Sequence, residues 1–144
     1  MDVCCCSFHH SDDEIRKMGY TPISFRDMFS DCDFVSLHCM LTPETYHIVD
    51  GKCFEACSPK LIFINAARGG LVDEEALYEA LVSKKLAAAG LDVFEQQPPS
   101  TDNPLLSLDN FLAGMHVAGS THEALERNGK AVVDSVFAAL GIEG

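Results

Sequence analysis

Apolar runs alternate with amphipathic stretches along this chain, and the alternation predicts strands that are each followed by a helix. Strands are expected over residues 2–7, 21–23, 33–39, 60–66, 86–93 and 110–116. Helices are expected over residues 11–19, 24–32, 50–58, 72–85 and 120–140, with a proline-rich loop over 95–110. This pattern indicates an α/β fold with a doubly wound, mostly parallel sheet and helices on both of its faces.

Helix ends are marked by short polar residues and by glycine. The expected N-caps, whose side chains accept hydrogen bonds from free N–H groups, are Ser11, Ser24, Asp50, Asp73 and Ser120. Ser120 and Glu123 have the spacing of a capping box. Gly19 and Gly141 are expected to end the first and last helices, because glycine readily adopts the left-handed conformation found there.

Size and charge limit the class of protein. The chain has 144 residues, about one domain, with 47% hydrophobic and 22% charged residues. Its formal charge of −12 argues against nucleic acid or an anionic membrane as a partner. No apolar run reaches the length of a membrane-spanning helix, and the start of the chain does not resemble a signal peptide.

The seven cysteines do not have the spacing of a zinc site, so no metal is expected. Cys4, Cys5 and Cys6 are consecutive and have the character of small apolar core residues. Reduced thiols in a cytoplasmic protein are the preferred interpretation.

Three side chains with useful chemistry follow three of the predicted strands. Arg68, Asp92 and His116 each lie at or just past a strand's carboxyl end, where ligands bind in open α/β sheets. Taken singly, they are more simply explained as a surface ion-pair partner, a turn former and a strand-end histidine. Their coincidence at one edge favours a site, because arginine can hold a carboxylate and histidine can transfer a proton.

No GxGxxG sequence occurs in the chain. A doubly wound dinucleotide-binding domain carries that turn after its first strand, at the centre of the sheet. The sequence is therefore expected to lack the first strand and the glycine-rich turn. Ser7, at the end of strand 2–7, then lies where such folds place the acid that binds the ribose.

Four segments carry a resemblance to a known family: SLHCMLTPET (36–45), INAARGGLVDEEAL (64–77), LDVFEQQPP (91–99) and HVAGST (116–121). They resemble the D-2-hydroxyacid dehydrogenases, in the carboxyl-terminal part of the NAD-binding domain, and phosphoglycerate dehydrogenases most of all. The resemblance implies a Rossmann-like fold and makes residues 1–144 a partial NAD-binding domain.

The resemblance also implies roles for individual residues. Arg68 would bind the substrate carboxylate, and His116 would donate the proton in reduction. NAD would be the cofactor, with NADP as the alternative because Ser7 replaces the usual acid. The residues expected to contact the cofactor are Ser7, Cys39, Ala66, Ala67, Arg68, Asp92, His116, Val117, Ala118 and Gly119.

Some positions depart from the family pattern. Gln97 stands where the family has a glutamate that pairs with the catalytic histidine, so it can hydrogen-bond His116 but brings no charge. Glu95 is close in sequence but out of register. Met40 and Met115 replace family prolines in the two turns beside the expected site.

The expected function is oxidoreduction of the CH–OH group of a D-2-hydroxy acid with NAD(P), with a small 2-hydroxy or 2-oxo acid as the partner. The isolated chain is expected to be inactive, because the substrate domain and the glycine-rich turn are missing. The alternative is a non-catalytic, nucleotide-dependent interaction module that resembles the C-terminal-binding-protein corepressors.

A homo-oligomer is expected as well. The missing strand would lie between strand 2–7 and strand 33–39, where it would leave two unpaired edges. The gap could close by direct pairing of those strands, by a strand from another copy, or by binding the missing piece.

Overall fold

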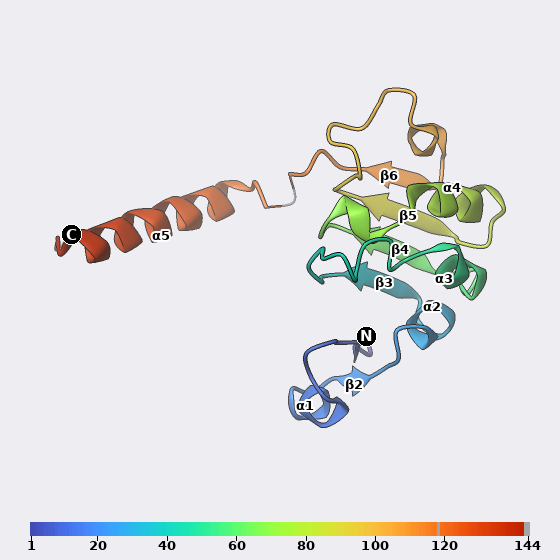
Figure 1. The fold of residues 1–144 in the computed structure, drawn as a ribbon, viewed down its shortest axis with the longest axis horizontal. Coiled ribbons are helices and arrows are strands. Elements are labelled where there is room, and N and C mark those ends of the chain that lie inside the picture. Colours follow the sequence, from blue (N-terminus) through green and yellow to red (C-terminus); the bar gives the residue numbers. More distant parts are fainter. Residues whose placement is uncertain (118, 143–144) are drawn as a thin grey trace.

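The computed structural model describes residues 1–117 and 119–142, which form an α/β fold with two separate parallel sheets (Figure 1). β1 (Cys4–Cys5) pairs with β2 (Thr21–Pro22). The larger sheet has the order β3-β4-β5-β6, formed by β3 (Phe34–Leu37), β4 (Ile62–Asn65), β5 (Ala88–Leu91) and β6 (Phe111–Ala113). All six predicted strands are present, and each is shorter than its predicted range.

The five predicted helices are also present: α1 (Asp12–Lys17), α2 (Asp27–Asp31), α3 (Gly51–Glu55), α4 (Glu74–Val82) and α5 (His122–Leu140). Two short 3₁₀ helices, η1 (Gly69–Leu71) and η2 (Pro104–Ser107), add to them. The second lies in the segment predicted to be a loop, because Asn103 caps it and a proline opens it.

Most of the predicted helix ends are confirmed. Ser11 forms a full capping box with Glu14, while Asp50 and Asp73 cap α3 and α4. The prediction of Ser120 as a cap was wrong, since Thr121 accepts the hydrogen bond from the Ala124 N–H instead.

The start predicted for the second helix was also wrong. The Ser24 side chain bonds the Asp27 N–H at 3.1 Å, but the chain makes a turn before α2 begins at Asp27.

One face of the larger sheet is buried beneath α2, α3 and α4. Three phenylalanines from α2, α3 and β4 pack with ring centroids 5.7–6.5 Å apart: Phe29, Phe54 and Phe63. Alternation along the strands directs Val35, Leu37, Ala89 and Leu91 into the same core. The loops at the carboxyl edge are therefore attached to a rigid, close-packed layer.

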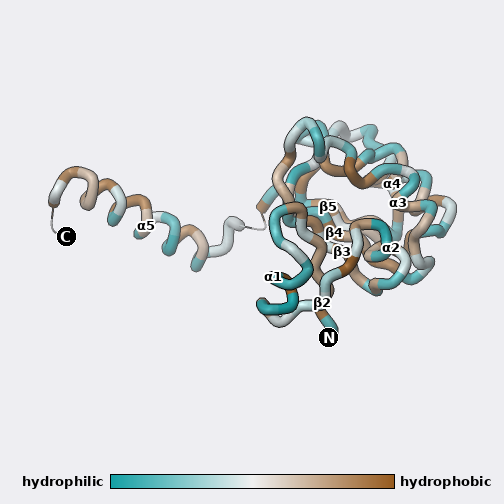
Figure 2. Tube along the Cα trace, turned by 60° about the horizontal axis from the view of Figure 1, so that its bottom comes forward, coloured by the Kyte–Doolittle hydropathy of each residue, from teal (hydrophilic) through white to brown (hydrophobic). Residues whose placement is uncertain are grey.

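The opposite face of the larger sheet carries no helix within the described residues, so the prediction of helices on both faces was wrong. Phe34 is 60% exposed and Leu112 is 74% exposed. α5 follows β6 but extends away from the sheet, and none of its residues is buried (Figures 1 and 2).

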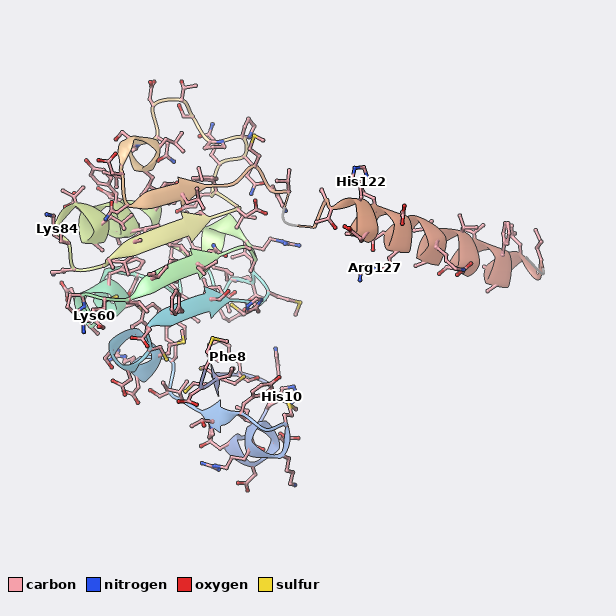
Figure 3. The ribbon with its side chains drawn as sticks, turned by 180° about the vertical axis from the view of Figure 1, so that it is seen from behind. Phe8, His10, Lys60, Lys84, His122 and Arg127 are labelled. Atoms are coloured by element: carbon pink, nitrogen blue, oxygen red, sulfur yellow. The ribbon has the colours of Figure 1, made fainter. Side chains whose placement is uncertain are left out.

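β1 and β3 do not pair with each other, so the predicted gap has not closed by direct pairing. A cavity of about 470 Å³ is lined by residues of β1 and β3 and of the segments beside them. Phe8 and His10, two of its lining residues, are labelled in Figure 3. All seven cysteines are unpaired thiols. Within the described part of the chain, no helix is long and apolar enough to cross a membrane.

Candidate active site

The carboxyl edge of the larger sheet gathers the candidate side chains. Arg68 follows β4, Asp92 follows β5 and His116 follows β6, and these three strands are neighbours in the sheet. Parallel strands end at the same edge, so the three loops come together there. The geometry of each loop determines what its side chain can do.

The loop that carries Arg68 is shaped by Asn65, the last residue of β4. Its side chain is fully buried, donates from Nδ2 to the Arg68 carbonyl at 2.8 Å and accepts at Oδ1 from the Ala67 N–H at 3.0 Å. Gly69 then packs against the backbone of Phe94, and a Cβ there would overlap the Phe94 carbonyl. Hydrogen bonds from Asn65 and close packing against the segment after β5 therefore fix the conformation of the turn that carries Arg68.

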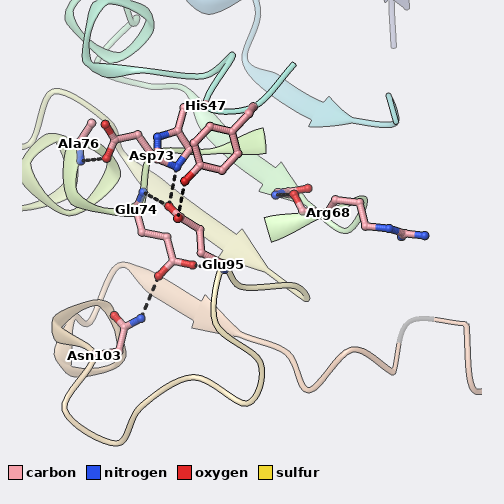
Figure 4. Close-up of polar contacts among 9 residues, drawn as sticks. His47, Arg68, Asp73, Glu74, Ala76, Glu95 and Asn103 are labelled. Carbon is pink, nitrogen blue, oxygen red and sulfur yellow. Dashed lines mark hydrogen bonds and ion pairs between the residues drawn. The ribbon is translucent and has the colours of Figure 1, made fainter. Parts of the chain in front are cut away.

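The Arg68 side chain is exposed and extends from the edge of the sheet (Figure 4). Its guanidinium donates to the Ala67 carbonyl at 2.6 Å. An open cavity of about 580 Å³ adjoins it, lined in part by Cys39, Ala67 and Arg68. Ala66 is exposed on the same loop. The structure thus brings three of the expected cofactor residues to one cavity.

His116 is fixed by the side chain that replaces the family glutamate. Its Nδ1 lies 2.9 Å from the Gln97 Oε1. Because that oxygen accepts, Nδ1 carries the hydrogen and Nε2 remains available to a ligand. His116 adopts a φ of 59°, an uncommon backbone conformation that a histidine tolerates better than most residues.

Asp92 supports the segment that carries His116. Its Oδ1 accepts from the Val117 N–H at 3.2 Å, and its own N–H donates to the Asn65 carbonyl at 3.0 Å. A Cβ at Gly114 would overlap the Asp92 carboxylate, so glycine is required for the close approach. Asp92 therefore connects the loops after β4 and β6.

Ser7 and Cys39 both line the 470 Å³ cavity, which shares Cys39 with the cavity at Arg68. Burial raises the pKa of the Cys39 thiol, so this thiol is neutral at pH 7. Although the chain has a formal charge of −12, neither cavity is lined by an aspartate or glutamate among the described residues. Both cavities can accept an anionic ligand without repulsion from a lining carboxylate.

The remaining expected residues contribute less to the described geometry. Gly119 is exposed, and a Cβ built there would meet nothing within 4 Å. Ala118 lies outside the described residues.

Sequence reasoning did not identify Asn65, although an amide at the end of the apolar run IFIN is a detectable signal. It also did not anticipate a polar cluster beside the site, formed by His47, Glu74, Glu95 and Asn103 (Figure 4). The Glu95 carboxylate accepts hydrogen bonds from His47 Nε2 at 2.9 Å and from the Glu74 N–H at 3.4 Å. The Glu74 carboxylate accepts from the side-chain amide of Asn103 at 2.9 Å. These contacts pair the Glu95 carboxylate with His47 and with the backbone of Glu74.

Comparisons with known proteins show which family the chain belongs to. The sequence model described as D-isomer specific 2-hydroxyacid dehydrogenase, NAD binding domain, matches residues 1–118. The hydroxypyruvate reductase of Thermotoga maritima is 46% identical over 126 residues, which cover 84% of this chain and 41% of that protein. The D-3-phosphoglycerate dehydrogenase of Archaeoglobus fulgidus is 40% identical over 126 residues, covering 88% of this chain and 24% of that protein.

Solved structures give the same result. The TT0316 protein of Thermus thermophilus has a TM-score of 0.87 at 33% identity and covers 99% of this chain and 44% of that one. D-lactate dehydrogenase with NAD⁺ from Lactobacillus jensenii has a TM-score of 0.83 at 26% identity, covering 99% of this chain and 46% of that one. The chain spans less than half the length of these relatives. It belongs to the D-isomer specific 2-hydroxyacid dehydrogenase family, in the NAD binding domain, whose cofactor is NAD.

Proposed function

We propose that residues 1–144 form a partial NAD-binding domain that supplies the cofactor-facing and acid–base groups of an oxidoreductase. The reaction is reversible oxidation of the CH–OH group of a D-2-hydroxy acid to the 2-oxo acid. The observation that carries the proposal is the pair formed by His116 and Gln97, 2.9 Å apart at the same sheet edge as Arg68. An oriented imidazole beside a fixed cation suits proton transfer on an anionic substrate.

The residues at the two cavities fit NAD. The lining of both cavities lacks carboxylates among the described residues, and Arg68 brings a positive charge to the cavity beside Cys39 and Ala67. Cys39, Ala66 and Ala67 would line the cofactor on one side, and Asp92, Val117 and Gly119 on the other. Ser7 brings no negative charge to the position where such folds place the ribose-binding acid, so NADP remains the alternative cofactor.

When bound, NAD supplies the hydride acceptor for C2 of the substrate. Arg68 would hold the substrate carboxylate through its guanidinium, which is exposed and can form two parallel hydrogen bonds. Nε2 of His116 would take the hydroxyl proton in oxidation and return it to the carbonyl oxygen in reduction. Gln97, bonded to Nδ1, would keep the ring oriented through both directions.

We further propose that the isolated chain does not turn over substrate. It matches 41% of the Thermotoga maritima relative, less than half of that protein's length. Unpaired thiols at all seven cysteines are compatible with a cytoplasmic location, which we propose together with a homo-oligomeric state.

The test is a chimaera in which this chain replaces the matching segment of the Thermotoga maritima hydroxypyruvate reductase. We expect the chimaera to oxidise NADH with hydroxypyruvate. Arg68→Ala should lower kcat/KM by roughly a hundredfold or more, the effect of losing a charged, bidentate clamp. Arg16→Ala is the matched control, because Arg16 makes only exposed ion pairs on α1, with Asp12 and Asp13.

An Arg68→Ala chimaera within tenfold of its parent in kcat/KM would contradict the assignment of Arg68. A chimaera that binds NADH and associates, yet never turns over, would instead support the interaction-module alternative.

A further inference from the structure

The turn that carries Arg68 lies between two segments that are distant in the sequence. On one side, the Gly70 carbonyl accepts from the His47 N–H at 2.8 Å, in the loop after β3. On the other side, Gly69 lies against the backbone of Phe94, in the segment after β5. The position of Arg68 therefore depends on how these two flanking segments are held together.

The Glu95 side chain joins the two flanking segments. Its Oε1 lies 2.9 Å from His47 Nε2 (Figure 4), and its Oε2 accepts from the Tyr46 hydroxyl at 3.4 Å. Its Oε1 also accepts from the N–H of Glu74, the first residue of α4. One carboxylate thus connects the loop after β3, the start of α4 and the segment after β5.

The backbone of Glu95 is fixed as well. Its N–H donates to the Glu74 carboxylate at 2.7 Å, and that carboxylate also accepts from the Asn103 side chain. Both carboxylates lie at the N-terminus of α4, where the free N–H groups of the helix favour negative charge. Each carboxylate therefore has its own donors, although the two lie in one cluster.

The contact between His47 and Glu95 is better shielded from water than the other ion pairs of the described residues. The two side chains are 30% and 32% exposed, whereas the Arg16 side chain is 57% exposed in its pairs on α1. The Tyr46 ring stacks on the His47 ring with centroids 4.0 Å apart. The Glu95 charge raises the pKa of the Tyr46 hydroxyl, which therefore stays protonated and able to donate. Such a partly buried, aligned contact is worth more than an exposed ion pair.

The segment from Asp92 to Gln97 contacts the loop of His116 at both of its ends. Asp92 accepts from a backbone N–H of that loop, and Gln97 bonds His116 Nδ1. Glu95 lies between these two contacts in the sequence and is attached to the loops beside Arg68. A displacement of Glu95 would therefore move Gln97, and with it the His116 ring, relative to Arg68.

We propose that Glu95 is a positioning residue for the oxidoreduction: through His47 and Glu74, it fixes the segment that carries Gln97 against the Arg68 turn. It thereby sets the distance between the Arg68 guanidinium, which would hold the substrate carboxylate, and the His116 imidazole, which would transfer the proton. The two groups must act together on one small molecule, so their separation limits turnover. This role rests on the proposed function, because only a reaction that uses both groups is sensitive to that separation.

The first test measures turnover in the Thermotoga maritima chimaera. Glu95→Ala should lower kcat for hydroxypyruvate reduction roughly tenfold, because the imidazole is displaced from the substrate. The KM for NADH should change less than about twofold, since the backbone bond from His47 to Gly70 still holds the loop beside the cofactor cavity. A residue that only stabilised the fold would lower the melting temperature and leave kcat per folded molecule unchanged.

Three variants separate position from charge and from folding. Glu95→Gln keeps an oxygen that accepts from His47 and from the Glu74 N–H, so its kcat should stay within roughly threefold of the parent. Glu75→Ala removes an exposed carboxylate from the first turn of α4 and should leave kcat unchanged. His47→Asn tolerates the φ of 51° at that position and should lower kcat as Glu95→Ala does. The double variant of His47 and Glu95 should lose no more than either single variant, because both break one contact.

A second test follows the His116 ring without turnover. Nδ1 carries the hydrogen because the Gln97 Oε1 accepts from it. Long-range proton–nitrogen correlation spectra of the chimaera report this tautomer, and His116→Asn identifies the signal. We expect Glu95→Ala to give a mixture of the two tautomers, and Glu75→Ala to retain one.

A Glu95→Ala chimaera with the kcat of the parent, or with an unchanged His116 tautomer, would overturn the proposal. So would losses from Glu95→Ala and His47→Asn that multiply in the double variant. A parent chimaera without turnover would refute the proposed function. A His116 tautomer that still responded to Glu95→Ala would then support the positioning of the ring, and one that did not respond would overturn it.

Discussion

Asn65→Ala tests how the loop that carries Arg68 is held. The substitution removes two hydrogen bonds, to the Arg68 carbonyl at 2.8 Å and from the Ala67 N–H at 3.0 Å. At about 1 kcal/mol each, they contribute about 2 kcal/mol. Because Ala67 is only half-buried and Arg68 is exposed, water can reach the freed groups and limits the further loss. The Asn65 side chain is fully buried, so the variant also loses packing contacts. The free energy of unfolding should therefore fall by about 2–3 kcal/mol in total.

The assay is performed in the Thermotoga maritima chimaera, where both stability and turnover can be measured. The midpoint of thermal unfolding should fall by roughly 4–12 °C. kcat/KM for hydroxypyruvate should fall roughly tenfold or more, because a small displacement of Arg68 misplaces the substrate carboxylate.

Asn110→Ala is the matched control. The Asn110 side chain makes two hydrogen bonds to the backbone as well, donating to the carbonyls of Leu81 at 3.3 Å and Ala87 at 3.2 Å. Asn110 precedes β6, so it lies at the opposite end of the sheet from Arg68. This variant should lose stability and keep the kcat/KM of the parent. If Asn65→Ala and Asn110→Ala lowered kcat/KM equally, the claim that Asn65 positions Arg68 would be refuted.

Three further predictions concern charge, cofactor and assembly. Gln97→Glu in the chimaera should shift the loss of reductase activity to higher pH, because a carboxylate beside Nδ1 favours protonated His116; an unchanged pH–rate profile would contradict this. The isolated chain should bind NADH only weakly, since it has no GxGxxG turn to hold the pyrophosphate; micromolar affinity in calorimetric titration would disprove that reasoning. The isolated chain should also self-associate through its open strand edges, which light scattering measures; a clean monomer that melts cooperatively above about 65 °C would count against it.

Periodicity and capping residues predicted the larger part of the fold. The strands β3–β5 are apolar runs bounded by turn residues, and Asp50 and Asp73 occupy the cap positions that their side chains predict. Ser120 was wrongly predicted as the cap of α5 because Ser120 and Thr121 are both good caps, and only the path of the chain decides between them. The bare sheet face could not be predicted, because the direction of α5 is a tertiary property.

The sequence indicated some residues of the candidate site and missed others. The ends of three predicted strands pointed to Arg68, Asp92 and His116, and the family resemblance added Gln97. The side-chain contact expected between Gln97 and His116 is present. The amide of Asn65 at the end of an apolar run marks a position in the sequence, but its partners, the Arg68 carbonyl and the Ala67 N–H, are known only once the turn is seen. The attachment of Glu95 to His47 joins residues 48 positions apart, and no local pattern contains such information.

The separation of the two sheets has a consequence for cooperativity. The core cluster that unites β3, β4 and β5 with α3 and α4 contains no buried residue from the first 28 positions, and Ile15 is the one buried residue of α1. The β1–α1–β2 unit therefore shares little packing energy with the rest of the molecule. We expect it to open while the larger sheet stays folded, so the chain should behave as two unequal folding units. A single melting temperature would then describe neither of them.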